Sequence, residues 1–191
     1  MTAIAYPFIQ RDLLQWTTGI TLELGAGDCQ YQGSVNGRHV GLDLPECPYP
    51  NSALRLSVFG DAMQLPFQDE SVSGAFAVAM LYLTVEPETV LAEVSRVLAP
   101  GGQVVLYDYT PRVLKRLGVP VRRTRRQWAT CLEKAGLTDV EDCSRRPFET
   151  ARLGLPVRMR WLVARALSRD TWLILKAEKP MSSSRTKHIG A

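Results

Sequence analysis

The chain has 191 residues, a hydrophobic fraction of 46% and a net charge of +4, which suit one soluble domain that buries a core without disulfides or metals. The four cysteines form no Cys-x-x-Cys pair and lie near no histidine cluster, so we predict reduced thiols and no metal site. No signal peptide is recognisable, and no apolar stretch approaches the roughly 18 residues that span a bilayer, so we expect a cytoplasmic protein without a transmembrane segment.

The charge is divided unevenly along the chain. Residues 1–110 hold 4 Lys or Arg against 12 Asp or Glu, whereas residues 111–169 hold 15 against 5. An acidic first part joined to a basic second part suggests two tasks that are divided along the chain.

Strand and helix patterns alternate from the beginning of the chain. A short helix is expected at residues 11–16. Short apolar runs that end in glycine or an acid predict strands at 20–27 and at 38–45, and a weaker third strand within 54–67 that ends at Gly60–Asp61. The continuous apolar run at 71–83 is typical of a central strand that is covered on both faces.

The second half of the chain continues this alternation. Apolar residues at helical spacing predict a helix at 87–102 that begins with a proline and ends in Pro-Gly-Gly. The further expected elements are a strand at 103–109, a helix at 125–137 and strands at 138–143 and 171–178. The pattern predicts an α/β fold with a largely parallel sheet, in a single domain over residues 1–179 followed by a disordered tail over 180–191.

The stretch TLELGAGDCQ, residues 21–30, raises the question of a nucleotide-binding turn. Gly25 and Gly27 follow the first strand, where a backbone without Cβ atoms can approach a ligand. Asp43 ends the second strand 18 residues after Gly25, about the spacing at which an acid meets ribose hydroxyls. The dinucleotide fingerprint needs a third glycine where Gln30 stands, and Asp28 would lie close to a pyrophosphate. A ligand with a ribose, no phosphate and a positive charge fits better.

Four ordered segments carry a family resemblance. They are LELGAG (22–27), GLDL (41–44), GDAMQLPFQDESV (60–72) and EVSRVLAPGGQVVLYDY (93–109). In this order and spacing they resemble the class I S-adenosylmethionine-dependent methyltransferases, especially the type 11 methyltransferase domain. The resemblance implies a Rossmann-like, doubly wound, mostly parallel seven-stranded sheet with helices on both faces, and S-adenosylmethionine as the cofactor.

The resemblance also implies a set of cofactor-binding residues. The expected residues are Glu23, Gly25, Ala26, Gly27, Asp43, Leu44, Asp61, Ala62 and Ala79. Three departures from the family pattern leave this set intact: Cys29 stands where a further glycine is common, Val72-Ser73 replaces Phe-Asp, and Tyr82 follows the fourth strand where many relatives carry a histidine.

The implied chemistry is an in-line displacement at an activated methyl group, in which orientation supplies much of the acceleration. A base is needed only if the acceptor must lose a proton. Asp108, at the end of the fifth strand, is the best base by position, with Tyr82 as a second catalytic candidate and Tyr109 as a candidate substrate contact. The alternative is that Asp108 only caps the turn that follows the strand.

The acceptor is indicated by absent motifs and by two basic, lid-like segments. No Asn/Asp-Pro-Pro-aromatic or Pro-Cys motif for base methylation is present, and no acid for metal-assisted catechol chemistry follows the fourth strand. The basic segments are 111–126 and 145–169, and in the second Arg158, Arg165 and Arg169 share one face of an expected helix. This basic stripe beside apolar residues suits an anionic, partly apolar acceptor or peripheral contact with a membrane surface; the alternative is a solvated helix face.

We therefore predict a methyltransferase that acts on a small-molecule or lipid acceptor. One alternative is an RNA or protein methyltransferase that uses the basic half as an electrostatic footprint. Another is a non-catalytic partner subunit that binds the cofactor. Nucleic acid is a less favoured partner than a small molecule.

Overall fold

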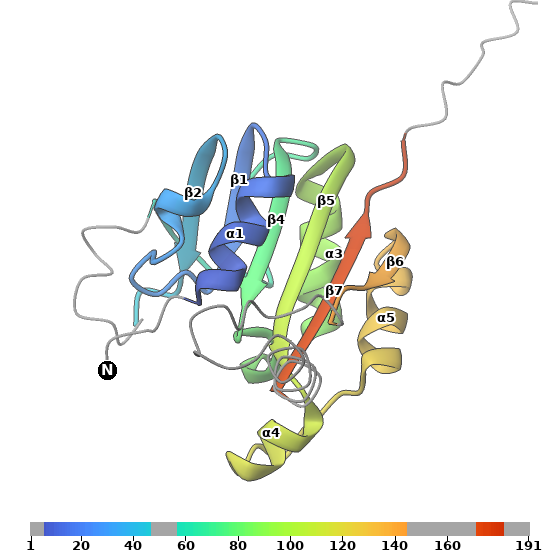
Figure 1. Ribbon diagram of the computed structural model, residues 1–191. Helices are drawn as coiled ribbons and strands as arrows, with labels where there is room; N and C mark the ends of the chain where they lie inside the picture. The colour runs from blue at the N-terminus through green and yellow to red at the C-terminus, as the bar shows by residue number, and fades with distance from the viewer. Residues whose placement is uncertain (1–5, 47–56, 145–170, 182–191) are drawn as a thin grey trace, which may run out of the picture.

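A sheet of mainly parallel strands forms the centre of the molecule (Figure 1). The computed structural model describes residues 6–46, 57–144 and 171–181. In these ranges seven strands form one sheet in the order β3-β2-β1-β4-β5-β7-β6. β7 runs antiparallel to β5 and β6, and the other neighbouring strands are parallel. The predicted Rossmann-like α/β fold is confirmed, with this one antiparallel strand as a refinement.

Each expected strand is present. Most are shorter than the predicted stretches, and the fifth begins at Leu98, inside the range 87–102 that was predicted as helix. The strands are β1 (Ile20–Leu24), β2 (Arg38–Asp43), β3 (Val58–Phe59), β4 (Val72–Val78), β5 (Leu98–Tyr109), β6 (Thr138–Asp142) and β7 (Trp172–Glu178). β4 stops before Ala79, whose φ of 49° turns the backbone into the left-handed region, which a strand cannot continue through. Continuous apolarity alone did not reveal this break.

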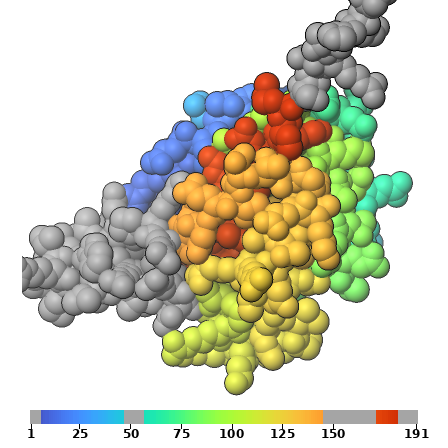
Figure 2. All heavy atoms as spheres, turned by 90° about the vertical axis from the view of Figure 1, so that its right-hand side faces the viewer, coloured from blue at the N-terminus to red at the C-terminus, as the bar shows by residue number. Residues whose placement is uncertain are grey.

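The described helices include one that the sequence pattern missed. They are α1 (Pro7–Trp16), α3 (Pro87–Val97), α4 (Pro111–Arg116) and α5 (Arg125–Lys134), with short 3-10 helices η1 (Gln32–Ser34) and η2 (Leu81–Leu83). Proline opens α1, α3 and α4, where its missing N–H costs nothing. The unpredicted helix is α4, which projects from the end of β5 (Figures 1 and 2).

Helices cover both faces of the sheet, as expected. α1 lies over one face, while α3 and α5 lie over the other (Figure 1). Alternate residues of each strand therefore face two separate cores. The core on the α1 side includes Ile9, Leu13, Phe76, Val105, Tyr107, Trp172 and Ile174. The core on the opposite side includes Leu22, Leu24, Ala75, Ala77, Val90, Leu91, Val94, Leu106, Trp128, Leu132, Leu173 and Leu175.

The segment between β3 and β4 is held against α3 by Arg96. The guanidinium donates to the backbone carbonyls of Leu65 (3.0 Å) and Phe67 (2.8 Å) and to the carboxylates of Asp69 (2.7 Å) and Glu93 (2.7 and 2.8 Å). This contact lowers the pKa of the Glu93 carboxyl, because a hydrogen-bonded cation stabilises the ionised form. Arg96 thereby fixes the chain that carries Asp61 and Ala62.

We predict that Arg96→Gln lowers the free energy of unfolding by about 1.5–3 kcal/mol, the range for lost hydrogen bonds to charged groups. Urea unfolding of the variant measures this loss. Arg38→Gln is the matched control, because Arg38 is an exposed arginine at the start of β2. A loss for Arg96→Gln no larger than that of the control would contradict the assigned role.

Candidate cofactor and acceptor site

The turn after β1 contains three left-handed residues at alternate positions. They are Gly25 (φ 63°), Gly27 (φ 56°) and Cys29 (φ 55°). A Cβ on Gly25 would lie 2.3 Å from Cγ of Met80, so only glycine fits beneath the segment that follows β4. Cys29, which stands where a further glycine is common in the family pattern, also lies in the left-handed region that favours glycine.

The Asp43 carboxylate joins this turn to the end of β2. Its Oδ2 accepts from the amide of Gly27 (2.8 Å) and its Oδ1 from the amide of Leu44 (2.8 Å). The Asp43 carbonyl also accepts from the amide of Gly60, after β3 (2.9 Å). Since an ionised carboxylate can accept about four hydrogen bonds, Asp43 has the capacity for ribose hydroxyls in addition to these two amides.

Asp61 and Ala62, which we expected at the cofactor, lie in the next loop of the same edge. The Oδ1 atom of Asp61 accepts from the amide of Met63 (2.8 Å), which fixes the carboxylate in a tight turn. Asp61 itself is exposed, whereas Ala62 is buried. The predicted contact Ala79 follows β4, and its amide donates to the carbonyl of Tyr107 (2.7 Å).

Two further acids are buried near the glycine turn. Oδ1 of Asp28 is buried and has no hydrogen-bond partner among the described residues, while its Oδ2 accepts from the side chain of Gln30 (3.3 Å). Glu23, which we expected at the cofactor, meets His39 with 2.6 Å between Oε2 and Nε2. Burial raises the pKa of Glu23, His39 opposes this rise, and the charges of Asp28 and Asp43 add to it.

The pairing of Glu23 with His39 was not predicted from the sequence. Glu23 alternates with Leu22 and Leu24, which belong to the core on the α3 side, so it points to the α1 side. The His39 ring lies 6.3 Å from Phe76 on that same side. The alternation of side chains along β1 and β2 could have revealed the pair. Glu23 and His39 lie on neighbouring strands, and their side chains point to the same face of the sheet.

Asp108 is a buried acid at the end of β5. It is 2% exposed, and burial raises its pKa to about 7 against the smaller effect of the Tyr109 and Tyr82 amides. The Tyr109 amide donates to Oδ1 at 2.7 Å. Oδ2 is buried and accepts no hydrogen bond within the part of the chain that the structure describes. Such an oxygen can accept a proton from a bound molecule.

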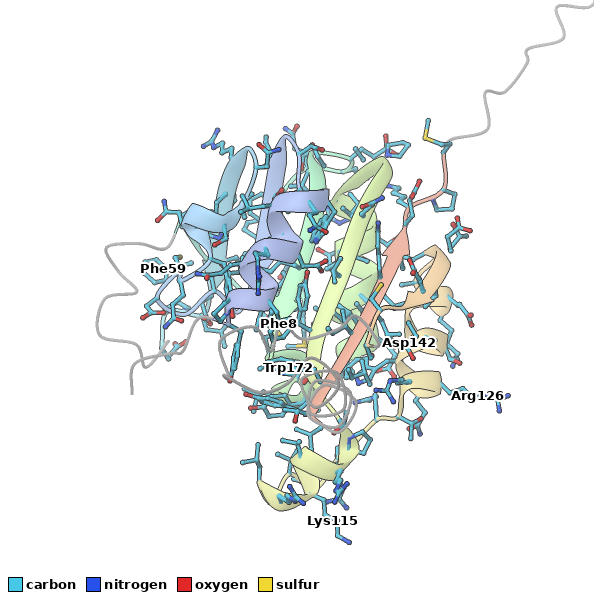
Figure 3. All side chains as sticks on the ribbon, in the orientation of Figure 1. Phe8, Phe59, Lys115, Arg126, Asp142 and Trp172 are labelled. Atoms are coloured by element: carbon cyan, nitrogen blue, oxygen red, sulfur yellow. The ribbon has the colours of Figure 1, made fainter. Side chains whose placement is uncertain are left out.

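Aromatic side chains gather at the end of β5 that carries Tyr109, and we name them the aromatic cluster: Tyr6, Phe8, Tyr82, Tyr109 and Trp172. Ring centroids lie 5.8 Å apart for Tyr82 and Tyr109 and 4.8 Å apart for Tyr109 and Trp172. The hydroxyls of Tyr6 and Tyr109 are 3.2 Å apart, and Figure 3 shows Phe8 beside Trp172. The structure thus brings Tyr82 and Tyr109 together, and it adds three aromatic residues that the sequence pattern did not single out.

The predicted arginine stripe cannot be placed in this site. Arg158, Arg165 and Arg169 lie outside the described residues, and so does the rest of segment 145–169. Within the described ranges, no three His, Cys, Asp or Glu side chains group as a metal ion would require. None of the helices in those ranges has the length and hydropathy needed to cross a bilayer.

Comparison with known proteins indicates the kind of domain to which this edge of the sheet belongs. The family model described as a methyltransferase domain matches residues 22–106, which include the glycine turn, Asp43 and Asp61. The chain carries a class I S-adenosylmethionine-dependent methyltransferase domain. S-adenosylmethionine is the cofactor of this domain.

Individual relatives of the methyltransferase domain are distant or partial. The O-methyltransferase cnsE of Penicillium expansum is 44% identical over 50 residues, which are 26% of this chain and 18% of that protein. The chain therefore matches less than a fifth of the length of this curated relative.

Solved structures show the same fold over most of the chain. The complex between the Haloferax volcanii Trm112 methyltransferase activator and its methyltransferase matches with a TM-score of 0.64 and 21% identity, covering 90% of this chain and 88% of that one. Haemonchus contortus phosphoethanolamine N-methyltransferase 2, in complex with S-adenosyl-L-methionine, matches with a TM-score of 0.64 and 14% identity, covering 92% and 53%.

The residues of the methyltransferase domain fit a positively charged cofactor. Asp28 offers a buried oxygen that no described residue partners and Asp43 an oriented carboxylate, and both lie close enough to affect the pKa of Glu23. Positive sulfonium and ammonium groups offset the cost of burying such charges. The individual cofactor contacts remain predictions.

We predict that Asp43→Ala weakens binding of S-adenosylhomocysteine at least tenfold, because a charged acceptor for ribose hydroxyls is lost. Asp43→Asn, which keeps an oxygen for the Gly27 amide, should also weaken binding. Calorimetry measures both affinities, with exposed Glu141→Ala as control. An Asp43→Ala affinity within about twofold of the parent would remove Asp43 from the site, since a lost charge-assisted contact is worth more.

A second prediction concerns the packing of the glycine turn on β2. A Cβ on Gly41 would lie 2.7 Å from Sγ of Cys29 and 3.1 Å from Cβ of Ala26. Gly41→Ala should therefore cost about 1–3 kcal/mol of stability, and Cys29→Gly should recover part of that loss by removing the sulfur. Urea unfolding of both single variants and the double variant measures the coupling. If the changes in the free energy of unfolding of the two single variants simply add in the double variant, Gly41 and Cys29 are not coupled, which would contradict the predicted contact.

Proposed function

We propose that the protein catalyses S-adenosylmethionine-dependent methylation of a hydroxyl group on an apolar small molecule. The observation that carries this proposal is Asp108 at the end of β5, a buried carboxylate whose Oδ2 has no hydrogen-bond partner among the described residues. Similarity to a fungal protein named as an O-methyltransferase supports oxygen as the methylated atom.

When bound, S-adenosylmethionine supplies an activated methyl group. The residues proposed to hold it are those of the glycine turn with Asp43 and Leu44, Asp61 and Ala62, and Ala79, with Asp28 facing its positive charge. These residues orient the cofactor through backbone amides and carboxylates, and orientation contributes much of the rate acceleration.

Asp108 is proposed to take the proton of the acceptor hydroxyl at Oδ2. The amide of Tyr109 holds Oδ1 at 2.7 Å, so the carboxylate is oriented before the acceptor arrives. A pKa of about 7 is suitable for a general base, because the carboxylate is ionised near neutral pH and still basic enough to accept the proton. Tyr82, whose backbone amide also affects Asp108, is proposed as a second catalytic contact.

The aromatic cluster supports an acceptor that is at least partly flat and apolar. Tyr82 and Tyr109 are only partly buried, so their rings could contact a bound molecule. Aromatic faces favour offset or edge contact with other rings and bury much apolar area. Tyr109 is therefore proposed as an acceptor contact, and Arg158 and Arg165 are proposed to face an anionic group on that acceptor. A lipid whose apolar part is aromatic or unsaturated is included in this class of acceptor.

The direct test is incubation of the protein with methyl-labelled S-adenosylmethionine and a cell extract. We expect the label in a low-molecular-weight organic fraction, as a methyl ether that resists mild base. Label in RNA or protein would contradict the proposal and favour the macromolecular alternative. Cofactor binding without transfer of label to any fraction would favour a non-catalytic partner subunit.

We predict that the rate of methyl transfer rises with pH through an apparent pKa near 7, as Asp108 ionises. Asp108→Asn should lower the rate about 100- to 10,000-fold and abolish this rise, because the amide cannot accept the proton. Initial rates with the identified acceptor at saturating cofactor measure both effects, with Glu133→Gln as an exposed control.

Asp108 should affect stability in the opposite direction from activity: the free energy of unfolding falls as pH rises, whereas the rate of methyl transfer increases. Because the folded-state pKa lies above the ordinary value of 3.8, the folded protein holds a proton that the unfolded chain releases, and stability falls as pH rises from about 4 to 7. Asp108→Asn should therefore be more stable than the parent at about pH 8, by less than about 4 kcal/mol, with little gain at about pH 4. A variant that loses both activity and stability at the higher pH would contradict this account of Asp108.

A further inference from the structure

The segment from α4 to the start of α5 has an unusual composition. Residues 111–126 contain seven arginines and lysines and no acidic or aromatic residue. Its exposed basic residues are Arg112, Lys115, Arg116, Arg122 and Arg126. The segment projects beyond the end of the sheet (Figures 1 and 2), and Figure 3 shows Lys115 at its tip and Arg126 pointing away from the body.

Two less exposed basic residues of the segment, Arg123 and Arg125, contact the rest of the domain. Arg123 lies 3.5 Å from Glu88 and places its guanidinium 5.3 Å from the ring centroid of Trp128. Arg125 lies 3.4 Å from Asp142. These contacts attach the segment to α3, α5 and β6. The five exposed basic side chains therefore extend from a segment that is fixed to the domain.

The projecting segment also exposes two large aliphatic side chains. Leu117 is 60% exposed and Val121 is 59% exposed, whereas Leu114 is 1% exposed and anchors α4 to the domain. Gly118, with φ of 75°, turns the chain after α4, and the Val119 amide donates to the Leu114 carbonyl at 2.9 Å. The turn is thus internally bonded while its aliphatic side chains contribute little to the core.

We propose that residues 111–126 dock the protein on an anionic lipid surface. Basic side chains are attracted by anionic headgroups, and exposed aliphatic side chains gain by entering the headgroup boundary. Single-stranded nucleic acid is favoured less, because its binding sites combine cations with aromatic stacking platforms, and this segment has no aromatic residue.

Docking would place the methyltransferase site next to the membrane. α4 begins at Pro111, two residues after Tyr109 and three after Asp108 on the chain, and the aromatic cluster lies at the same end of β5. An apolar acceptor dissolved in the bilayer would then be close to its site. The docking surface itself does not depend on the proposed methyl transfer, and its test uses no activity.

The test is co-sedimentation of the full chain with vesicles of phosphatidylcholine alone and of phosphatidylcholine mixed with phosphatidylglycerol. Two variants separate the contributions: Lys115→Gln/Arg116→Gln/Arg122→Gln removes charge, and Leu117→Ser/Val121→Ser removes apolar surface. The matched controls are Arg38→Gln/Lys134→Gln and Met181→Ser, at exposed positions outside the segment. Circular dichroism establishes that every variant is folded.

We expect binding to the mixed vesicles only, weakened at least tenfold in the charge variant, because each basic residue near an anionic surface contributes roughly fivefold. The Leu117→Ser/Val121→Ser variant should also bind more weakly, and the controls should bind like the parent. No binding to mixed vesicles, or equal binding by all variants, would overturn the proposal. Binding of a single-stranded RNA that the charge variant loses and the Leu117/Val121 variant keeps, without vesicle binding, would assign the surface to nucleic acid instead.

Discussion

The hydrogen bond from the Gly27 amide to the Asp43 carboxylate connects the ends of two parallel strands. Its geometry requires a left-handed turn after β1, which glycine provides at Gly25 and Gly27 and which Cys29 also adopts. The Asp43 carbonyl extends the connection to the chain after β3. Because the carboxyl ends of parallel strands meet at one edge, this single carboxylate organises the edge of the methyltransferase domain where we propose that the ribose binds.

Buried negative charge is the second feature of the same edge. Glu23 is partnered by His39, while Asp28 and Asp108 each keep one buried oxygen without a partner in the described ranges. A buried carboxylate without full hydrogen bonding lowers stability. Such groups are expected where a ligand or a reaction uses them, so the molecule gives up stability at the positions where a cationic cofactor and an acidic hydroxyl would be bound.

Much of this arrangement could be predicted from the sequence, for physical reasons that differ between elements. The cofactor was predicted from four ordered segments that include the glycine turn and the strand-end acids Asp43 and Asp61, because each of these patterns lies within one local stretch of the chain. The break at Ala79, the pairing of Glu23 with His39 and the joining of Tyr6 and Phe8 to Trp172 depend on which strands become neighbours. Local patterns do not carry that information. Helix α4 is too short for a periodic signal.

The account depends most directly on where the cofactor product binds. A crystal structure of the protein with S-adenosylhomocysteine would test this in one experiment. We expect the ribose hydroxyls within hydrogen-bond distance of Asp43, the amino group near Asp28, and the sulfur on the side that faces Asp108. A ligand bound away from the ends of β1 and β2, with Asp43 touching only the amides of Gly27 and Leu44, would contradict the account.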